Sequence, residues 1–285
     1  MHGALVMGAL TLGLIAAFSW GVHDTMVRYI SQKLGVFRSL FPVLLTGTVV
    51  TSILAFALDT GSMTSEARVM AILSGLVFGV TGMSFYAALA IGPVRVVAPV
   101  VASFPILSVA WAVANGQSVT MLQWLAVLVI VGGCGFAAMS SANEEAAPPT
   151  LQAILWSVLA AVGFALSFAL GQLSVADGTE MTAIAIARVG AVAVVVLIAL
   201  ILRKPVLPVR SALPILLAMG LLDAIAIGAV MVAGNYAYPE FASVGASIFG
   251  VLTIIFASIF LKEPVTRSQW IGIVIVFVAI GYLAL

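Results

Sequence analysis

Long apolar runs separated by short polar interruptions make up almost the whole chain. Cut at glycines, prolines and charge clusters, these runs predict helices at residues 4–30, 36–58, 67–90, 94–114, 119–139, 151–174, 180–202, 211–236, 240–260 and 267–285. A membrane-spanning helix needs about 20 apolar residues, so each run is long enough to cross a bilayer. The loops are too short to hold a soluble domain. The pattern therefore predicts an all-α membrane protein with ten transmembrane helices.

The second half of the chain repeats part of the first. The segment Val119–Trp124 returns as Val265–Trp270 with its Val-Thr and Gln-Trp pairs, and at the same offset residues 83–139 align without a gap onto residues 229–285. Few residues are identical, but the apolar runs and the residues that interrupt them fall at the same positions. A self-match at one fixed offset indicates an internal duplication.

Residues 140–150 form the only segment with linker composition, and they separate a first five-helix repeat, 1–139, from a second, 151–285. Because each repeat has an odd number of spans, the second enters the membrane with the opposite orientation. The two halves are then related by a pseudo-two-fold axis in the membrane plane. We therefore expect two inverted five-helix repeats around a central cavity.

Loop charges agree with this inversion. The loop after the first helix carries Arg28, Lys33 and Arg38, whereas its counterpart after the sixth carries only acidic residues. Conversely, the mainly acidic loop after the second helix corresponds to a basic loop after the seventh, with Arg203 and Lys204. Because cytoplasmic loops collect Lys and Arg, we expect the odd-numbered loops in the cytoplasm and both termini outside.

Composition narrows the function classes. The chain is 64% apolar and 7% charged, whereas soluble domains have roughly 25% charged residues. A net charge of +1 argues against a nucleic-acid partner. Cys134 is the only cysteine, which rules out an internal disulfide and a multi-cysteine metal site, and no metal or cofactor is expected. The start Met1–Gly3 lacks the basic region of a signal peptide, so we expect the first apolar run to be retained.

Four motifs resemble one known superfamily. Leu261–Gly272 contains Lys-Glu-Pro followed by Gln-Trp, and Gly116–Trp124 is a weaker copy in which Gln117 replaces the usual Glu. Phe18–Gly21 ends in Trp-Gly, and Ser103–Pro105 joins a small residue to a proline. Together and in this order, the motifs resemble the drug/metabolite transporter superfamily, specifically its EamA-type ten-helix exporters.

The resemblance covers nearly the whole chain and implies a carrier of the bacterial inner membrane that works by alternating access. Size and the lack of tails also suit the amino-acid and metabolite exporters of the superfamily, such as the YddG type. The expected partners are a small-molecule substrate and the lipid bilayer, and we expect the carrier to work as a monomer.

Ionisable residues at membrane depth are the sharpest candidates for a site, because each is costly unless it is paired or wetted. Arg188 and Asp223 fall at similar depths in antiparallel neighbouring helices, so they could form an ion pair. Such a pair either pins two helices together or binds substrate. A zwitterionic amino acid needs one cation and one anion, which this pair supplies.

His23 and Asp24 allow two interpretations. If the first helix ends near Val22, both are interfacial and Asp24 offsets Arg28. The resemblance instead implies that positions after the Trp-Gly pair of Trp20 face the cavity, and we favour this interpretation. Small multidrug pumps of the superfamily use a carboxylate in the first helix to exchange protons for drugs, so proton coupling stays open.

Aromatic residues form a second set. Trp20 and Tyr86 are the preferred cavity residues, since each lies within a span and has a polar tip that lipid would leave unsatisfied. Trp124 and Trp270 begin helices and are expected to be interface anchors. The full expected substrate-binding set is Trp20, His23, Asp24, Tyr86, Phe104, Trp156, Phe168, Arg188, Asp223 and Tyr236.

Helix breakers occur at corresponding places in the two repeats. Pro93, Pro99 and Pro105 interrupt the start and middle of the fourth helix, and Pro239, Gly245 and Gly250 do the same in the ninth. Paired breaks of this kind point to the moving and binding region of a transporter, although close packing by small residues is the alternative. For the GxxxG pattern of the third helix, from Gly75 to Gly79, packing is the expected role.

The sequence thus favours a secondary transporter that exports amino acids or similar small metabolites. A proton-coupled drug exporter is an alternative. A sugar-phosphate or nucleotide-sugar carrier would need a cluster of Lys and Arg in the cavity, and Arg188 alone argues against it. An enzyme is not expected, because the only histidines are His2 and His23 and no hydrolase or nucleotide-binding motif occurs. A channel is a more remote alternative.

Overall fold

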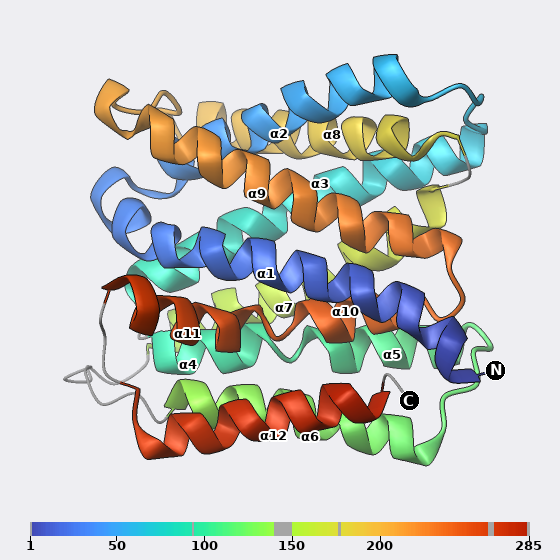
Figure 1. The fold of residues 1–285 in the computed structure, drawn as a ribbon. Helices are drawn as coiled ribbons and strands as arrows, with labels where there is room; N and C mark the ends of the chain where they lie inside the picture. The colour runs from blue at the N-terminus through green and yellow to red at the C-terminus, as the bar shows by residue number, and fades with distance from the viewer. Residues whose placement is uncertain (1, 93, 140–149, 176–177, 262–264, 284–285) are drawn as a thin grey trace.

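The structure is a computed structural model, which describes residues 2–92, 94–139, 150–175, 178–261 and 265–283. All regular structure in these ranges is helical, and the helices lie side by side in one bundle (Figure 1). Within the described residues, eight helical segments are long and apolar enough to cross a membrane, by length and composition. Two shorter apolar segments, Pro99–Ala114 across the junction of two helices and Arg267–Leu283, accompany them.

The helices agree closely with the apolar runs. They are α1 (His2–Leu34), α2 (Val36–Leu58), α3 (Ser65–Ile91), α4 (Val94–Val101), α5 (Phe104–Ala114), α6 (Met121–Met139), α7 (Leu151–Ser174), α8 (Glu180–Ile201), α9 (Leu213–Val232), α10 (Glu240–Ala246), α11 (Phe249–Leu261) and α12 (Arg267–Leu283), with 3-10 turns at Arg210–Ala212 and Ala233–Asn235. The predicted helices at 94–114 and 240–260 are each split in two. Apart from Thr150, the linker expected at 140–150 lies outside the described residues, as does Pro93.

The Thr and Gln that recur in the two repeats form a helix-start motif. In the first copy, Gln123 Oε1 accepts from Thr120 N at 2.9 Å, and Thr120 Oγ1 accepts from Gln123 N at 3.2 Å. Thr266 and Gln269 make the same pair of bonds at the start of α12. Each pair satisfies two backbone N–H groups that a helix start leaves free, as in a capping box. The recurring Thr and Gln therefore mark where α6 and α12 begin.

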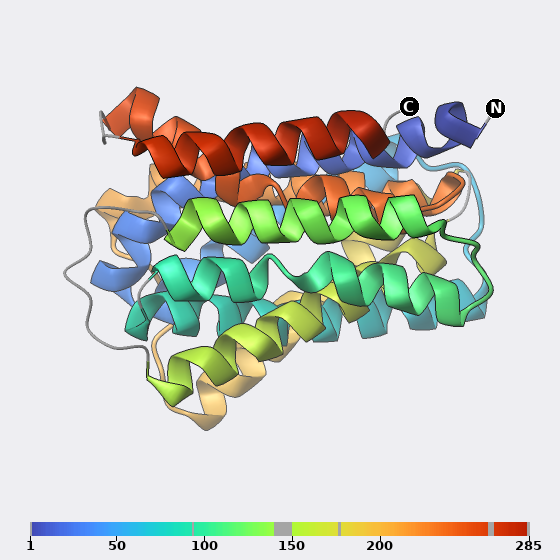
Figure 2. The ribbon, with the colours of Figure 1, turned by 90° about the horizontal axis from the view of Figure 1, so that it is seen from below.

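Contacts between helices come in matched pairs. Helix α1 packs against α9, and α7 packs against α3 in the same manner. Likewise, α3 packs against α8, and α9 packs against α2. Two further large contacts join elements that correspond to each other in the two repeats, α2 with α8 and α6 with α12. Figure 2 shows α6 and α12 side by side at one edge of the bundle. Two repeats related by a two-fold axis would produce this pattern, because each contact between halves then has a symmetry mate.

The two split helices break at corresponding positions. The chain turns at Ala102–Ser103 between α4 and α5, and at Ser247–Ile248 between α10 and α11. At each break a serine hydroxyl donates to the carbonyl three residues before it, Ser103 to Val100 at 2.7 Å and Ser247 to Val244 at 2.8 Å. The broken helices meet in the bundle, where α5 packs against α10.

Of the five expected hinge residues, three lie next to a helix break and two have other roles. Pro99 lies inside α4 just before its break, and Pro105 lies in the first turn of α5. Gly250 follows the second break, and a Cβ added to it would meet nothing within 4 Å. Gly245, in contrast, packs tightly, since a Cβ there would lie 2.9 Å from the carbonyl oxygen of Leu10. Pro239 caps the start of α10 and does not interrupt it.

The GxxxG pattern of α3 is a packing surface, as expected. A Cβ on Gly75 would overlap the carbonyl oxygen of Ala187, and one on Gly79 would overlap the side chain of Val194. Glycine therefore lets the backbones of α3 and α8 approach closely, which is the usual use of small residues between membrane helices.

We expect Gly75→Ala to destabilise the protein by about 1–3 kcal/mol, because α3 and α8 must separate to accommodate the methyl group. Thermal unfolding in detergent measures the change. Gly132→Ala in α6 is the matched control, since a Cβ there meets nothing within 4 Å. Equal melting temperatures for the two variants would contradict the close-packing role of Gly75.

Candidate functional site

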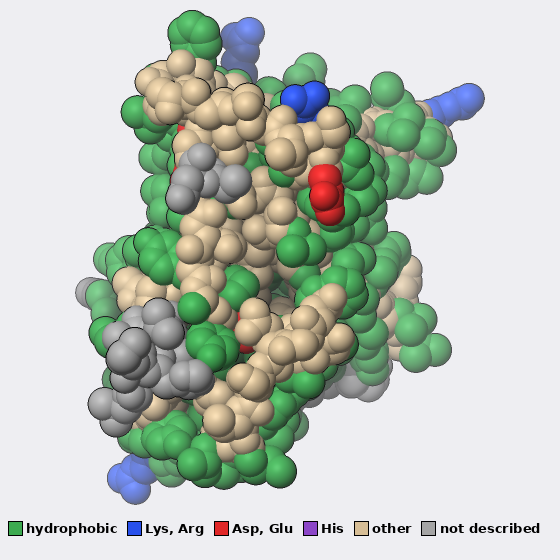
Figure 3. Space-filling model, turned by 90° about the vertical axis from the view of Figure 1, so that its right-hand side faces the viewer, with side chains coloured by type: hydrophobic (Ala, Val, Ile, Leu, Met, Phe, Trp, Pro, Cys, Tyr) green, Lys and Arg blue, Asp and Glu red, His purple; other side chains and the backbone are tan. Residues whose placement is uncertain are grey.

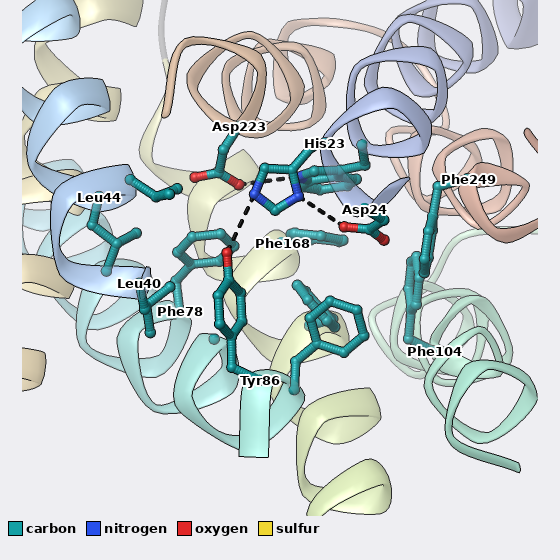
Figure 4. Close-up of a pocket in the computed structure, with 15 residues that line it drawn as sticks. His23, Asp24, Leu40, Leu44, Phe78, Tyr86, Phe104, Phe168, Asp223 and Phe249 are labelled. Carbon is teal, nitrogen blue, oxygen red and sulfur yellow. Dashed lines mark hydrogen bonds and ion pairs between the residues drawn. The ribbon is translucent and has the colours of Figure 1, made fainter. Parts of the chain in front are cut away.

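A small cavity lies at the centre of the bundle, enclosed by side chains from seven helices (Figure 4). Its volume is about 40 Å³. Its lining is Trp20, His23, Asp24, Leu40, Val43, Leu44, Phe78, Gly82, Phe85, Tyr86, Phe104, Phe164, Phe168, Asp223 and Phe249. Most of this wall is aromatic, and the polar groups come from α1, α3 and α9.

An ion pair stands at one wall of the cavity. Arg188 Nη1 donates to Asp223 Oδ2 at 2.7 Å, and Trp20 Nε1 donates to the other carboxylate oxygen at 3.0 Å. Both charged side chains are buried, with 2% and 7% of their surface exposed. The predicted ion pair between α8 and α9 is therefore confirmed, and Trp20 ties it to α1.

Arg188 itself lies behind Asp223 and does not line the cavity. Its guanidinium carbon is 5.9 Å from the ring centre of Phe78, and Gly47 of α2 lies close enough that a Cβ there would be 2.7 Å from Nη1. The Nε and Nη2 atoms are buried with no hydrogen-bond partner among the described residues. This edge of the guanidinium, which can bind a carboxylate through two parallel hydrogen bonds, is unused.

A second polar chain crosses the cavity. His23 Nδ1 is 2.8 Å from Asp24 Oδ1, and the Tyr86 hydroxyl is 3.4 Å from His23 Nε2 (Figure 4). When Nδ1–H donates to the carboxylate, Nε2 is free to accept from Tyr86 in the neutral ring or to donate in the imidazolium. His23 and Asp24 therefore face the cavity, and the interfacial alternative is wrong.

Phe164 is the centre of an aromatic layer. Its ring centre lies 5.5 Å from that of Phe168, 5.8 Å from Phe104 and 6.0 Å from Phe85. Trp20 stacks on Phe168 at 5.6 Å with an angle of 16° between the rings. These tilted and stacked contacts are the preferred geometries of aromatic pairs. The layer closes one side of the cavity with rings from α1, α3, α5 and α7.

The structure gathers most of the expected site residues. Seven of them line the cavity: Trp20, His23, Asp24, Tyr86, Phe104, Phe168 and Asp223. Trp156 is half-buried on an earlier turn of α7, and Tyr236 is 47% exposed beyond the end of α9. Neither contributes to the cavity, because the direction of a side chain depends on the rotation of its helix and not on its depth alone.

Several cavity residues lie outside the expected set, above all Phe78, Phe85 and Phe164. A signal existed for two of them, since Phe78 and Phe85 are seven residues apart and so share a face of α3 with Gly82. Phe249 comes directly after the break between α10 and α11 and lines the cavity from there. No spacing rule in an apolar helix would select it.

The cavity is too small for an amino acid as it stands. One water needs about 10–15 Å³ of such space, so 40 Å³ holds only a few waters. A substrate with a side chain therefore enters only when the aromatic layer or the surrounding helices move.

A bundle of apolar helices with a paired, buried ionic network beside a central cavity has the features of a multi-pass membrane transporter. Comparison with known families supports this class. The profile of the EamA-like transporter family matches residues 7–139 and, separately, residues 151–285. The chain therefore belongs to the EamA-like transporter family of the drug/metabolite transporter superfamily, whose members move small molecules across membranes.

A solved structure described as "Crystal structure of protein" has the same fold. It superposes with a TM-score of 0.77 over 96% of this chain and 95% of its own, with 18% sequence identity. No curated protein gives a significant sequence match.

We expect Asp223→Asn to destabilise the protein by about 3–5 kcal/mol, because it leaves the buried charge of Arg188 uncompensated. The double variant Arg188→Gln/Asp223→Asn removes both charges and should recover most of this loss. Thermal and denaturant unfolding in detergent measure both. The control is Glu66→Gln, an exposed carboxylate at the start of α3. Wild-type stability in Asp223→Asn would show that the pair contributes nothing to folding.

Proposed function

We propose that this protein is a secondary transporter that exports amino acids or similar small zwitterionic metabolites. The observation that carries the proposal is the charge pattern at the centre. One guanidinium, one imidazole and two carboxylates lie in or beside a cavity whose wall is mostly aromatic. The common backbone of an amino acid carries one cation and one anion, so this set of groups complements it.

In the proposed complex the substrate exchanges partners with the resident groups. The ammonium group binds among the carboxylates of Asp24 and Asp223, which already face the cavity. The carboxylate binds the free Nε–Nη2 edge of Arg188 once the helices around it separate. The apolar side chain then replaces contacts within the aromatic layer, which suits broad specificity.

Alternating access is proposed from the paired helix breaks. The chain would cross the bacterial inner membrane ten times, with repeats 1–139 and 151–285 inverted about a linker at 140–150. Most described basic side chains outside the bundle centre, such as Lys33, Arg203 and Arg267, belong to the end of the bundle away from both termini. That end is proposed to be cytoplasmic. The transporter would act as a monomer.

Export of cationic drugs in exchange for protons is the second candidate. The specific observation in its favour is Asp24, a carboxylate of α1 that faces the cavity and bonds to a titratable histidine. Phosphate-bearing substrates fit less well, since Arg188 is the only Arg or Lys among the described buried residues.

Counterflow in proteoliposomes tests whether the ion pair binds substrate or only pins α8 to α9. A set of toxic amino acids and dipeptides, scored by growth rescue in cells that express the chain, first supplies the substrate. We expect the double variant Arg188→Gln/Asp223→Asn to regain stability but to lose at least about 100-fold in exchange rate, because the substrate carboxylate loses its guanidinium and the ammonium group keeps only Asp24. Tyr282→Phe, an exposed position, is the control.

Two outcomes would contradict the proposal. If the stable double variant exchanged substrate at the wild-type rate, the ion pair would only hold α8 and α9 together and would not bind substrate. Flux that rises linearly with substrate and shows no trans-stimulation would identify a channel.

The second break supplies a test of the hinge. Gly250→Ala fits without a clash, so we expect normal stability with a several-fold slower exchange, because an alanine stiffens the start of α11. Gly245→Ala should instead lower the melting temperature, since its methyl group meets the backbone of α1. Unfolding and counterflow of both variants check this. An unchanged rate in Gly250→Ala would place the moving segment elsewhere.

A further inference from the structure

A second cavity lies at the end of the bundle where α1 begins and α12 ends. Figure 3 shows that this end is hollowed near its centre. The cavity has a volume of about 180 Å³. Its lining is Ser108, Trp111, Ala112, Asn115, Gln117, Ala169, Gln172, Leu173, Gly234, Pro239, Glu240 and Ser243. This lining is far more polar than that of the central cavity, and its only charged member is Glu240.

Three of these side chains are buried without partners. Both carboxylate oxygens of Glu240 and the hydroxyls of Ser108 and Ser243 have no hydrogen-bond partner among the described residues. Glu240 is 4% exposed. Unpaired polar groups buried in this way are costly, and a carboxylate costs the most unless a cation or a proton neutralises it. Four oxygen atoms thus surround a space that has room for a ligand.

The neighbouring amide fits an acceptor site as well. Gln172 Nε2 donates to the carbonyl of Pro239 at 2.9 Å and to that of Val230 at 3.2 Å. With its N–H groups used in this way, the side chain of Gln172 has only its carbonyl oxygen to offer a ligand. No described Arg or Lys lines the cavity. Glu240, Ser108, Ser243 and Gln172 therefore offer oxygen acceptors with a single negative charge, beside the N–H groups of Trp111, Asn115 and Gln117.

The position of this cavity links it to the central one. On α5, Phe104 lines the central cavity and Ser108 lines the second. On α7, Phe168 and Gln172 are divided in the same way. Four residues of helix span about 6 Å, so the second cavity begins one turn beyond the aromatic layer.

We propose that Glu240, Ser108 and Ser243 form a binding site for a small monovalent cation on the exit path of the transporter. A single carboxylate with neutral oxygen ligands suits either an alkali ion or a primary ammonium group, such as that of a departing substrate. This assignment to the exit path rests on the proposed export function. The cation site itself rests only on the buried oxygens and the cavity.

Cation-dependent stability of the purified full-length protein tests the site. Melting temperatures are compared in sodium chloride, methylammonium chloride and N-methyl-D-glucamine chloride at equal ionic strength. We expect sodium or methylammonium to raise the melting temperature with a saturating dose dependence, because a ligand of the folded state stabilises it by mass action. Glu240→Gln should weaken the apparent affinity at least about tenfold, and Ser108→Ala/Ser243→Ala should weaken it less. Glu66→Gln, an exposed carboxylate, should respond like wild type.

Each result decides a point. A response to sodium alone assigns an inorganic cation, and a response to methylammonium alone assigns an ammonium group. No response to either, or a full response in Glu240→Gln, overturns the site and leaves a protonated Glu240. Amino-acid counterflow on the same preparations separates the two proposals. Intact counterflow without a cation response refutes only the site, whereas a cation response without counterflow refutes only the proposed export function.

Discussion

The buried ion pair between Arg188 and Asp223 holds the centre of the bundle together. Burying either charge alone at this depth would cost a large desolvation free energy. The short contact between the two groups and the hydrogen bond from the Trp20 N–H offset this cost. Gly47 and Phe78 complete the surroundings of the guanidinium. Five helices, α1, α2, α3, α8 and α9, are thus positioned around one arginine side chain.

This constraint also shapes the cavity. Trp20, His23 and Asp24 follow one another at the spacing that places side chains on a single face of a helix. When Trp20 bonds to Asp223, the same face of α1 carries His23 and Asp24 toward the cavity. The two carboxylates then stand in one space with different partners. A charged ligand can enter this network by exchanging partners, without leaving a buried charge alone.

Much of this arrangement could be predicted from the sequence, for identifiable reasons. Continuous apolar runs of about 20 residues predict helices, because a helix satisfies all of its backbone polar groups within the segment that crosses the bilayer. Arg188 and Asp223 could be paired because depth along a helix follows from residue number. The rotation of each helix about its axis follows from packing, so Trp156 and Tyr236 could not be excluded, nor Phe164 singled out, among many aromatics.

Glu240 illustrates a different limit. At the start of a predicted span, a carboxylate resembles an ordinary interfacial charge, and only its place in the fold removes it from water. It lies in the short helix α10, which is buried throughout and packs against α5. Whether a charge at a helix end is solvated or buried therefore depends on how closely the other helices pack around that end.

The two breaks relate the cavities to the movement that transport requires. Helix α5 carries both Phe104 of the aromatic layer and Ser108 of the outer cavity, and it begins directly after a break. Helix α10, which packs against α5, carries Glu240 and Ser243 and ends at the other break. In the proposed cycle, a displacement of this helix pair would open the aromatic layer and separate the oxygen ligands in one step. Passage of substrate and release of a bound cation would then be coupled by geometry, because the same short helices carry both sets of groups.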